Sequence, residues 1–215
     1  MNHKDYIIWG STGHAKVLAE AIRPQGGRII ALFDNDSSVN SSLSDVPLIG
    51  GMNKFKEWTN GLENLTEIHA LVAIGGARGR DRLNIQEELR DNGIIISTLV
   101  HSKAFVAENA RLGVGTQVLA MASVAANTVI GNGCIINHRA SVDHECNIGE
   151  GAHIAPGATL CGCVEIGDFT MVGAGSVILP RLNIGKDCVV GAGAVVTKNI
   201  PNNTVVVGNP AMKLH

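Results

Sequence analysis

Residues 130–149 read IGNGCIINHRASVDHECNIG, and within this stretch an aliphatic side chain recurs at every sixth position. The same step extends in both directions and gives sixteen aliphatic residues, from Val106 to Val196. Two residues before each lies a second column, from Ala104 to Ala194, in which fourteen of sixteen residues are Ala, Ser, Thr or Cys. Neither a helix nor an ordinary strand has this period, so the pattern indicates an internal hexapeptide repeat.

A glycine follows the aliphatic residue at every third repeat, which predicts that three hexapeptides make one turn of eighteen residues. These glycines are Gly113, Gly131, Gly149, Gly167 and Gly185. We expect a coil with three short flat sides, in which one aliphatic side chain from each side points into a narrow prism. The glycines are expected to mark one corner, where a positive φ is cheap only for glycine.

The first hundred residues follow a different pattern, in which apolar strands alternate with amphipathic helices. Strands are predicted at residues 6–9, 28–33, 70–74 and 94–96, and helices at residues 15–22 and about 80–90. This alternation is typical of a small parallel α/β domain. We therefore predict a Rossmann-like α/β domain over residues 1–100, followed by an all-β parallel β-helix over residues 101–215. The C-terminal tail, which contains Val207-Gly208-Asn209-Pro210-Ala211, is expected to leave the prism as a loop.

A nucleotide site is one interpretation of the loops that follow these strands. The carboxyl ends of parallel strands meet at one edge of the sheet, where the loops at 10–14, 34–36 and 75–76 would converge. An anion at the first helix N-terminus would meet free backbone N–H groups, and a carboxylate after the second strand can hold a ribose hydroxyl. The full G-x-G-x-x-G motif is absent, however, so the glycine turn is equally consistent with close packing of a helix on a strand.

Composition argues against several partners. The net charge of −2 and the charged fraction of 17% give no electrostatic footprint for nucleic acid or an anionic membrane surface. No apolar run approaches the roughly 18 residues of a membrane span, and residues 1–5 lack the start of a signal peptide, so a cytoplasmic location is expected. The five cysteines show no C-x-x-C spacing, and we interpret them as reduced, small packing residues.

The candidate for chemistry is His144, which lies in the tripeptide Asp143-His144-Glu145. It follows the inward-pointing Val142 by two positions and should therefore project from the coil. A neighbouring carboxylate can orient an imidazole for general base catalysis. The alternative is a solvated histidine with no catalytic role.

A zinc site is the other possibility for the histidines of the middle coils, His138, His144 and His153. The carbonic anhydrases that share this type of β-helix need two histidines five residues apart. Here the gaps are six and nine residues, so no metal is expected.

Taken together, the chain resembles the bacterial nucleotide-aminosugar N-acetyltransferases and the sialic acid O-acetyltransferase-like proteins grouped with them. The resemblance covers nearly the whole chain. It depends on Gly10-Ser11-Thr12-Gly13-His14-Ala15-Lys16-Val17, Ala73-Ile74-Gly75 followed by Arg80, Asp143-His144-Glu145, His153 and the closing Gly208-Asn209-Pro210-Ala211. It implies left-handed winding of the β-helix, acetyl-CoA as acyl donor, and a homotrimer with active sites between subunits.

The resemblance also implies a role for each site residue. His144 would be the general base and Glu145 would raise its basicity. Four residues would contact acetyl-CoA, at the thioester or along the pantetheine and nucleotide arm: His153, Gly162, Ala174 and Ala192. Six residues would bind the nucleotide sugar, the first three at the diphosphate or sugar and the others at the nucleoside: Thr12, Gly13, His14, Asp34, Asn35 and Gly75.

The predicted function is acetyl-CoA-dependent N-acetylation of a nucleotide-linked 4-amino-4,6-dideoxy sugar, with direct attack by the amine. An amine that attacks a thioester needs alignment, proton removal and oxyanion stabilisation, and no metal. Two alternatives remain open. The acceptor could be a hydroxyl of a sialic acid-type sugar, or the chain could be a non-catalytic scaffold that binds nucleotide sugars.

Overall fold

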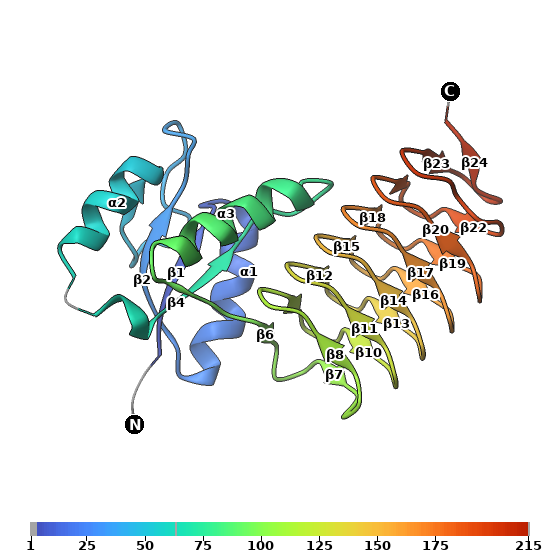
Figure 1. The fold of residues 1–215 in the computed structure, drawn as a ribbon, viewed down its shortest axis with the longest axis horizontal. Helices are drawn as coiled ribbons and strands as arrows, with labels where there is room; N and C mark the ends of the chain where they lie inside the picture. Colours follow the sequence, from blue (N-terminus) through green and yellow to red (C-terminus); the bar gives the residue numbers. More distant parts are fainter. Residues whose placement is uncertain (1–3, 63, 215) are drawn as a thin grey trace. The chain divides into compact units, whose positions relative to one another are not determined.

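The computed structural model describes residues 4–62 and 64–214 and forms two compact units (Figure 1). The first unit comprises Met1–Ile74 and Asp81–Leu99, and the second comprises Gly75–Arg80 and Val100–His215. Residues 1–3 and 215, which the predicted domain bounds include, lie outside the described residues. The segment Gly75–Arg80 groups with the β-helix, which the sequence did not indicate. The boundary at residue 100 stays a proposal.

The first unit is built on a five-stranded sheet with the order β3-β2-β1-β4-β5, in which every neighbouring pair is parallel. The strands are β1 (Asp5–Trp9), β2 (Arg28–Phe33), β3 (Leu48–Gly50), β4 (Ile68–Val72) and β5 (Ile95–Ile96). The helices are α1 (Gly13–Ile22), α2 (Met52–Asn60) and α3 (Gly79–Asp91), with short 3-10 helices η1 (Arg23–Gln25) and η2 (Leu65–Glu67). The predicted α/β architecture is confirmed, whereas β3 and α2 were not predicted.

An aromatic cluster fills the core of this unit. The Trp9 and Phe33 rings stack with centroids 5.7 Å apart, and Phe55 meets Phe33 edge-on at 5.2 Å. All three side chains are buried, and Trp58 packs against them from α2. Aromatic pairs of this kind stabilise a core beyond the burial of their area, so the cluster holds β2 and α2 together.

The second unit is a left-handed parallel β-helix with three faces made of two-residue strands (Figure 1). The first face stacks β7 (Phe105–Val106), β10 (Ser123–Val124), β13 (Ser141–Val142), β16 (Thr159–Leu160), β19 (Val177–Ile178) and β22 (Val195–Val196). The second stacks β8 (Arg111–Leu112), β11 (Val129–Ile130), β14 (Asn147–Ile148), β17 (Glu165–Ile166) and β20 (Asn183–Ile184).

The third face begins at β6 and includes the end of the chain. It stacks β6 (Leu99–Val100), β9 (Gln117–Val118), β12 (Ile135–Ile136), β15 (His153–Ile154), β18 (Met171–Val172), β21 (Val189–Val190), β23 (Val205–Val207) and β24 (Met212–Lys213). In the pairs that precede β23, each strand residue pairs with the residue eighteen positions on, as Val124 does with Val142, so the predicted turn length is confirmed. The last turn is shorter, since Val189 pairs with Val205. The tail was expected to leave the prism as a loop, but β23 continues the face and β24 pairs with it antiparallel.

The two predicted columns fill the interior of the prism. The aliphatic column is buried from Val118 to Val196, and burying each such side chain contributes roughly 1.5–3 kcal/mol. In the small column the threonines are also buried. Their hydroxyls donate to backbone carbonyls of the next coil, as Thr128 Oγ1 does to the Asp143 carbonyl oxygen at 2.8 Å. Cys134 and Cys188 donate through their thiols in the same way, at 3.0 and 3.1 Å. Each of these threonine and cysteine side chains therefore ties two coils together.

The expected reason for the eighteen-residue glycine column is wrong. Positive φ angles occur two residues later, at Gly115, Gly133 and Gly151, and then at the non-glycine residues Phe169 and Asp187. The column glycines are needed because the next coil lies against them. A Cβ atom on Gly149 would come within 2.5 Å of the Asp168 backbone nitrogen.

Among the described residues, no helix has the length and apolar character needed to cross a bilayer.

Candidate active site

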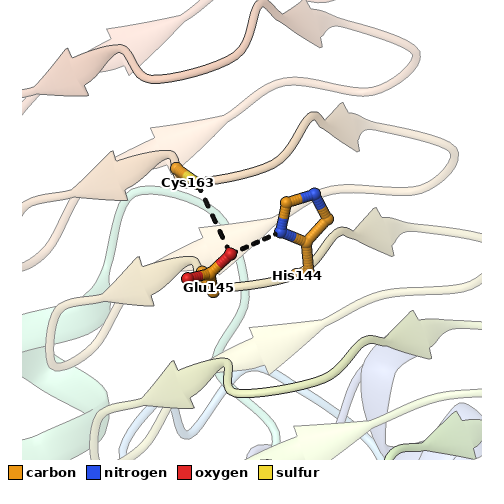
Figure 2. Close-up of side chains that lie close together, drawn as sticks. All are labelled: His144, Glu145 and Cys163. Carbon is orange, nitrogen blue, oxygen red and sulfur yellow. Dashed lines mark hydrogen bonds and ion pairs between the residues drawn. The ribbon is translucent and has the colours of Figure 1, made fainter.

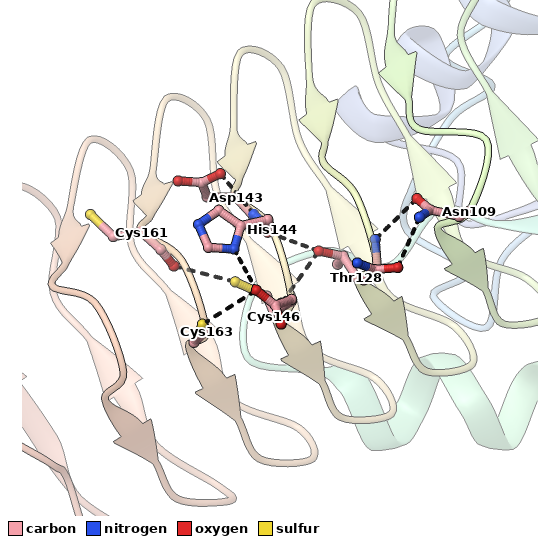
Figure 3. Close-up of polar contacts among 9 residues, drawn as sticks. Asn109, Thr128, Asp143, His144, Cys146, Cys161 and Cys163 are labelled. Carbon is pink, nitrogen blue, oxygen red and sulfur yellow. Dashed lines mark hydrogen bonds and ion pairs between the residues drawn. The ribbon is translucent and has the colours of Figure 1, made fainter.

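His144 lies at a corner of the β-helix between β13 and β14, where the backbone is held by neighbouring residues (Figure 3). The Asp143 carbonyl oxygen accepts a hydrogen bond from Thr128 Oγ1, and its carboxylate accepts one from the His144 backbone N–H at 2.7 Å. Glu145 has a positive φ of 57° and turns the chain toward β14. The sequence places His144 between two acidic residues, but only the Glu145 carboxylate contacts the imidazole, and the Asp143 carboxylate accepts a hydrogen bond from the backbone of the corner.

The His144 imidazole pairs with the Glu145 carboxylate, with 2.9 Å between Nδ1 and Oε2 (Figure 2). A carboxylate can only accept a hydrogen bond, so this contact places the ring proton on Nδ1 and leaves the lone pair on Nε2. Both side chains are at least half exposed. This arrangement is suited to removing a proton from a bound nucleophile.

Gly162 lies directly beside the imidazole from the next coil. A Cβ atom on Gly162 would come within 2.5 Å of His144 Nε2 and 2.7 Å of Cε1. The absence of a side chain at residue 162 therefore makes room for the ring in its paired position. This function of Gly162 was not predicted, although residue 162 follows residue 144 by one eighteen-residue turn.

Cys163 lies beside the His144–Glu145 pair. Its thiol lies 3.9 Å from Glu145 Oε2, and its backbone N–H donates to the His144 carbonyl at 2.9 Å. None of the five cysteines forms a disulfide bond, and three of them (Cys134, Cys146 and Cys188) are buried as expected for packing residues. Cys161 and Cys163 are only partly buried and lie on the loop beside His144.

His153 lies on the third face and is almost fully buried, with 6% of its surface exposed. Its Nδ1 lies 3.3 Å from the Gly76 carbonyl oxygen, which requires a proton on Nδ1, and its Nε2 lies 3.1 Å from Asn137 Nδ2. Gly75 is adjacent, since a Cβ atom there would be 3.7 Å from His153 Cε1. In the described structure the imidazole thus holds the Gly75–Arg80 segment, and contact with the thioester stays a prediction.

The Gly75–Arg80 segment is fastened to the β-helix at two further points. Arg80 Nη2 donates to both carboxylate oxygens of Asp187 at 2.8 Å, and its guanidinium carbon lies 3.9 Å above the Phe169 ring centroid. Gly79 packs so closely on the Gly151 backbone that a side chain would not fit. Sequence reasoning missed this attachment because residues 80 and 187 are separated by 107 positions.

The other residues predicted to contact CoA lie on one side of the prism. Ala174 and Ala192 are exposed, one eighteen-residue turn apart, and the Ala174 carbonyl accepts a hydrogen bond from the Gly193 N–H at 2.8 Å. Both alanines are accessible to a ligand, and their contact with CoA stays a prediction.

In the first unit the loops after β1 and β2 meet as predicted. Asp34 Oδ2 accepts from the Ser11 N–H at 2.7 Å, and Asp34 Oδ1 accepts from the Asp36 N–H at 3.0 Å. Asn35 Oδ1 accepts from the Met52 N–H at the start of α2, at 3.3 Å. These predicted nucleoside-binding side chains therefore shape their own loops, and ligand contact stays a prediction.

The glycine turn after β1 also approaches the end of β4. Gly10 has a positive φ of 101°, and a Cβ atom there would lie 2.8 Å from the Ala73 carbonyl oxygen. Thr12 and Gly13 are exposed at the beginning of α1, and His14 is partly exposed. The first turn of α1 contains no acidic residue, so its N–H groups suit an anionic ligand.

The structure does not bring the three histidines of the middle coils together. Among residues 4–62 and 64–214, the group whose ligand atoms come together is His144, Glu145 and Cys163, and it includes neither His138 nor His153. The interpretation as a three-histidine zinc enzyme therefore has no support in the described structure.

Two family matches cover most of the chain. Residues 5–88 match the PglD N-terminal domain, and residues 127–162 and 163–198 match the bacterial transferase hexapeptide (six repeats). No curated protein sequence matches.

Several solved structures are similar over nearly their whole length. PerB from Caulobacter crescentus, in complex with CoA and GDP-perosamine, is 32% identical, with 98% of this chain and 97% of that chain covered and a TM-score of 0.88. The acetyltransferase domain of PglB from Neisseria gonorrhoeae FA1090 is 31% identical, with 99% and 100% covered and a TM-score of 0.87. WeeI from Acinetobacter baumannii AYE is 26% identical, with 97% and 99% covered and a TM-score of 0.87. The perosamine N-acetyltransferase has also been solved with a histidine replaced by asparagine or alanine.

Proposed function

The chain belongs to the hexapeptide-repeat sugar N-acetyltransferases with a PglD-type first domain, and from this we propose that it transfers acetyl from acetyl-CoA to a nucleotide-linked 4-amino-4,6-dideoxy sugar. The observation that carries the proposal is the 2.9 Å contact between His144 Nδ1 and Glu145 Oε2 on a rigid corner of the prism. Two similar enzymes have been solved with CoA and GDP-perosamine or with acetyl-CoA.

In the proposed reaction the sugar amine attacks the thioester carbonyl carbon, and a C–N bond forms as the carbonyl π electrons move to oxygen. His144 Nε2 takes the proton that the amine loses, and the Glu145 carboxylate stabilises the imidazolium through Nδ1–H. The tetrahedral intermediate collapses with cleavage of the C–S bond, and the imidazolium returns the proton to the CoA sulfur. No step requires a metal.

The binding residues are proposed on the same basis. Thr12, Gly13 and His14 would hold the diphosphate or sugar, and the exposure of Thr12 and Gly13 at the beginning of α1, whose first turn contains no acidic residue, supports this. Asp34, Asn35 and Gly75 would hold the nucleoside. His153, Gly162, Ala174 and Ala192 would contact CoA, which the exposure of the two alanines supports. The identity of the nucleotide base is left open.

We also infer that the chain works as a homotrimer with sites between subunits, and that it acts in the cytoplasm. The flat faces of the prism and the family support the trimer. A trimer would complete each site with residues of a second subunit.

The test is a thiol-release assay with acetyl-CoA and a panel of nucleotide-linked 4-amino-4,6-dideoxy sugars, each beside its 4-hydroxyl analogue. We expect turnover with the amines, and turnover with hydroxyl analogues alone would favour the O-acetyltransferase alternative. Absence of acetyl-CoA binding by calorimetry would favour the scaffold alternative.

His144→Ala is expected to keep the fold and to lower kcat at least about 10²-fold, since removing a positioned general base typically costs 10²–10⁴-fold. The matched control is His138→Ala, which removes an imidazole from a neighbouring corner and should keep most of the activity. An unchanged rate in His144→Ala would remove this histidine from the mechanism.

A further inference from the structure

The cluster around the proposed base contains three different metal-binding atoms. His144 Nδ1, Glu145 Oε2 and Cys163 Sγ lie within 4.8 Å of one another, and Figure 2 shows both the imidazole and the thiol directed at the same carboxylate oxygen. The first two come from one corner, and Cys163 comes from the next coil, one turn after Glu145. Acetyl transfer requires the first two residues but makes no use of the thiol.

An imidazole nitrogen, a carboxylate oxygen and a thiolate sulfur are the three ligand types that Zn²⁺ prefers in proteins. With Zn–N of about 2.0–2.1 Å and Zn–S of about 2.3 Å, the ligand atoms of a tetrahedral site lie about 3.3–3.8 Å apart. His144 Nδ1 lies 2.9 Å and Cys163 Sγ 3.9 Å from Glu145 Oε2, and the three ligand atoms lie within 4.8 Å of one another, so the cluster would have to adjust to hold the ion. The His144 and Glu145 side chains are at least half exposed, so small rotations would suffice and a water molecule could complete the tetrahedron.

We propose that His144, Glu145 and Cys163 form an inhibitory site for a soft divalent cation such as Zn²⁺. This inference rests on the proposed function, because inhibition follows from the role of His144 as base. On binding, the Nδ1 proton moves to Nε2, the Cys163 thiol proton is released to solvent, and Zn–N, Zn–O and Zn–S bonds form. Nε2 then carries a hydrogen and can no longer accept the proton of the acceptor amine.

The ion therefore opposes the reaction and is not a cofactor. The metal would bind His144 Nδ1, which must keep its proton during catalysis, and the Glu145 carboxylate, which orients the ring. Hard cations such as Mg²⁺ prefer all-oxygen ligands and should not compete. The site would make the transferase sensitive to free zinc through a thiol that catalysis does not need.

The first test measures metal binding on the resting protein without any CoA. Co²⁺ is added as a spectroscopic substitute for Zn²⁺, and a thiolate-to-metal charge-transfer band is followed, then its displacement by Zn²⁺. We expect the band in the wild-type chain and its loss in Cys163→Ala. The matched control is Cys161→Ala, because Figure 3 shows the Cys161 thiol directed away from His144 and Cys163. Absence of the band, or equal bands in both variants, would overturn the proposal.

The second test measures initial rates of sugar acetylation by product detection, because the CoA thiol itself binds zinc. We expect Zn²⁺ to inhibit the wild-type chain, EDTA to restore activity, and Mg²⁺ to have no effect. Cys163→Ala should turn over normally without zinc and need at least about tenfold more Zn²⁺ for half inhibition, as expected when a metal site loses a ligand. If the wild-type chain binds Co²⁺ but shows no transfer, the proposed function fails and the metal site stands. Equal Zn²⁺ sensitivity in both cysteine variants would overturn the inhibitory site.

Discussion

Gly162 determines where the imidazole of His144 can lie. Because the ring occupies the space where a Cβ atom would be, even a methyl group should push it away from its paired position. The ring is half exposed and can move outward without unfolding the corner. The position of the base therefore depends on a residue of the next coil.

We expect Gly162→Ala to lower kcat at saturating acetyl-CoA at least about tenfold, because misplacing a catalytic group by about 1 Å can cost up to 10²-fold. The measurement is a full kinetic series with circular dichroism as the check of folding. Gly61→Ala is the control, since its nearest neighbour would be the Trp58 carbonyl oxygen at an ordinary 3.6 Å. If kcat is unchanged and only KM for acetyl-CoA rises, the contact with the ring has no kinetic role.

The cysteines differ sharply in their surroundings. Burial raises the pKa of the Cys146 thiol from 9.0 to about 11, and the thiol donates to the Cys161 carbonyl at 3.3 Å. Cys161 and Cys163 are partly exposed. Burial and pKa therefore both protect Cys146 from electrophiles.

We predict that iodoacetamide at pH 8 modifies Cys161 and Cys163 in the folded chain and leaves Cys146 intact, as read by mass spectrometry. Denaturation should expose all five thiols. Because the folded pKa of Cys146 lies above the unfolded value, the stabilisation from its neutral thiol should be complete below pH 9 and decrease between pH 9 and about 11. Rapid labelling of Cys146 at pH 8 would show that the corner opens readily.

At the scale of the element, each coil of the β-helix packs closely on the next coil at one of its corners and is less crowded at another. The glycine column meets the backbone of the next coil, whereas the positive-φ glycines of another corner, Gly157, Gly175 and Gly193, face open space. Gly157 has nothing within 4 Å of a built Cβ, and the same corner holds Met121 and Arg139 at positive φ in other coils. Gly149 and Gly157 therefore meet different constraints: the first lies against the next coil, and the second has a positive φ.

We expect Gly149→Ala to lower the free energy of unfolding by about 1–3 kcal/mol, the usual cost of overpacking, because its Cβ would overlap the Asp168 backbone. Gly157→Asn should change it by less than about 1 kcal/mol, since asparagine tolerates this conformation. Both changes in the free energy of unfolding are measured by urea unfolding monitored by circular dichroism. Equal effects of the two substitutions would contradict the distinction.

At the scale of the whole molecule, the proposed trimer governs whether a single chain can be active. Sedimentation equilibrium is expected to show three chains per particle, and activity should fall on dilution in parallel with dissociation. A stable monomer with full activity would contradict the shared-site proposal. The control is a concentration series with acetyl-CoA saturating, which separates dissociation from loss of donor.

The sequence alone determined the period of the β-helix, its inward columns and the α/β character of the first unit. It could do so because these features repeat: a six-residue step sets which side chains point inward, and an eighteen-residue turn sets which residues pair. The pairing of His144 with Glu145 was also accessible, since the two are chain neighbours. The positions of Gly162 and Cys163 beside them follow from one turn of the same period, although the sequence analysis did not use it.

Only the tertiary structure decided which contacts form between residues whose separation in the sequence is not a multiple of the repeat. The attachment of Gly75–Arg80 to the coils, through Arg80 with Asp187 and His153 with Gly76, joins residues 107 and 77 positions apart. The true reason for the glycine column also required coordinates, because a clash with the next coil and a positive φ select the same residue type. A repeat encodes its own register, whereas contacts between surfaces depend on where unrelated segments meet in space.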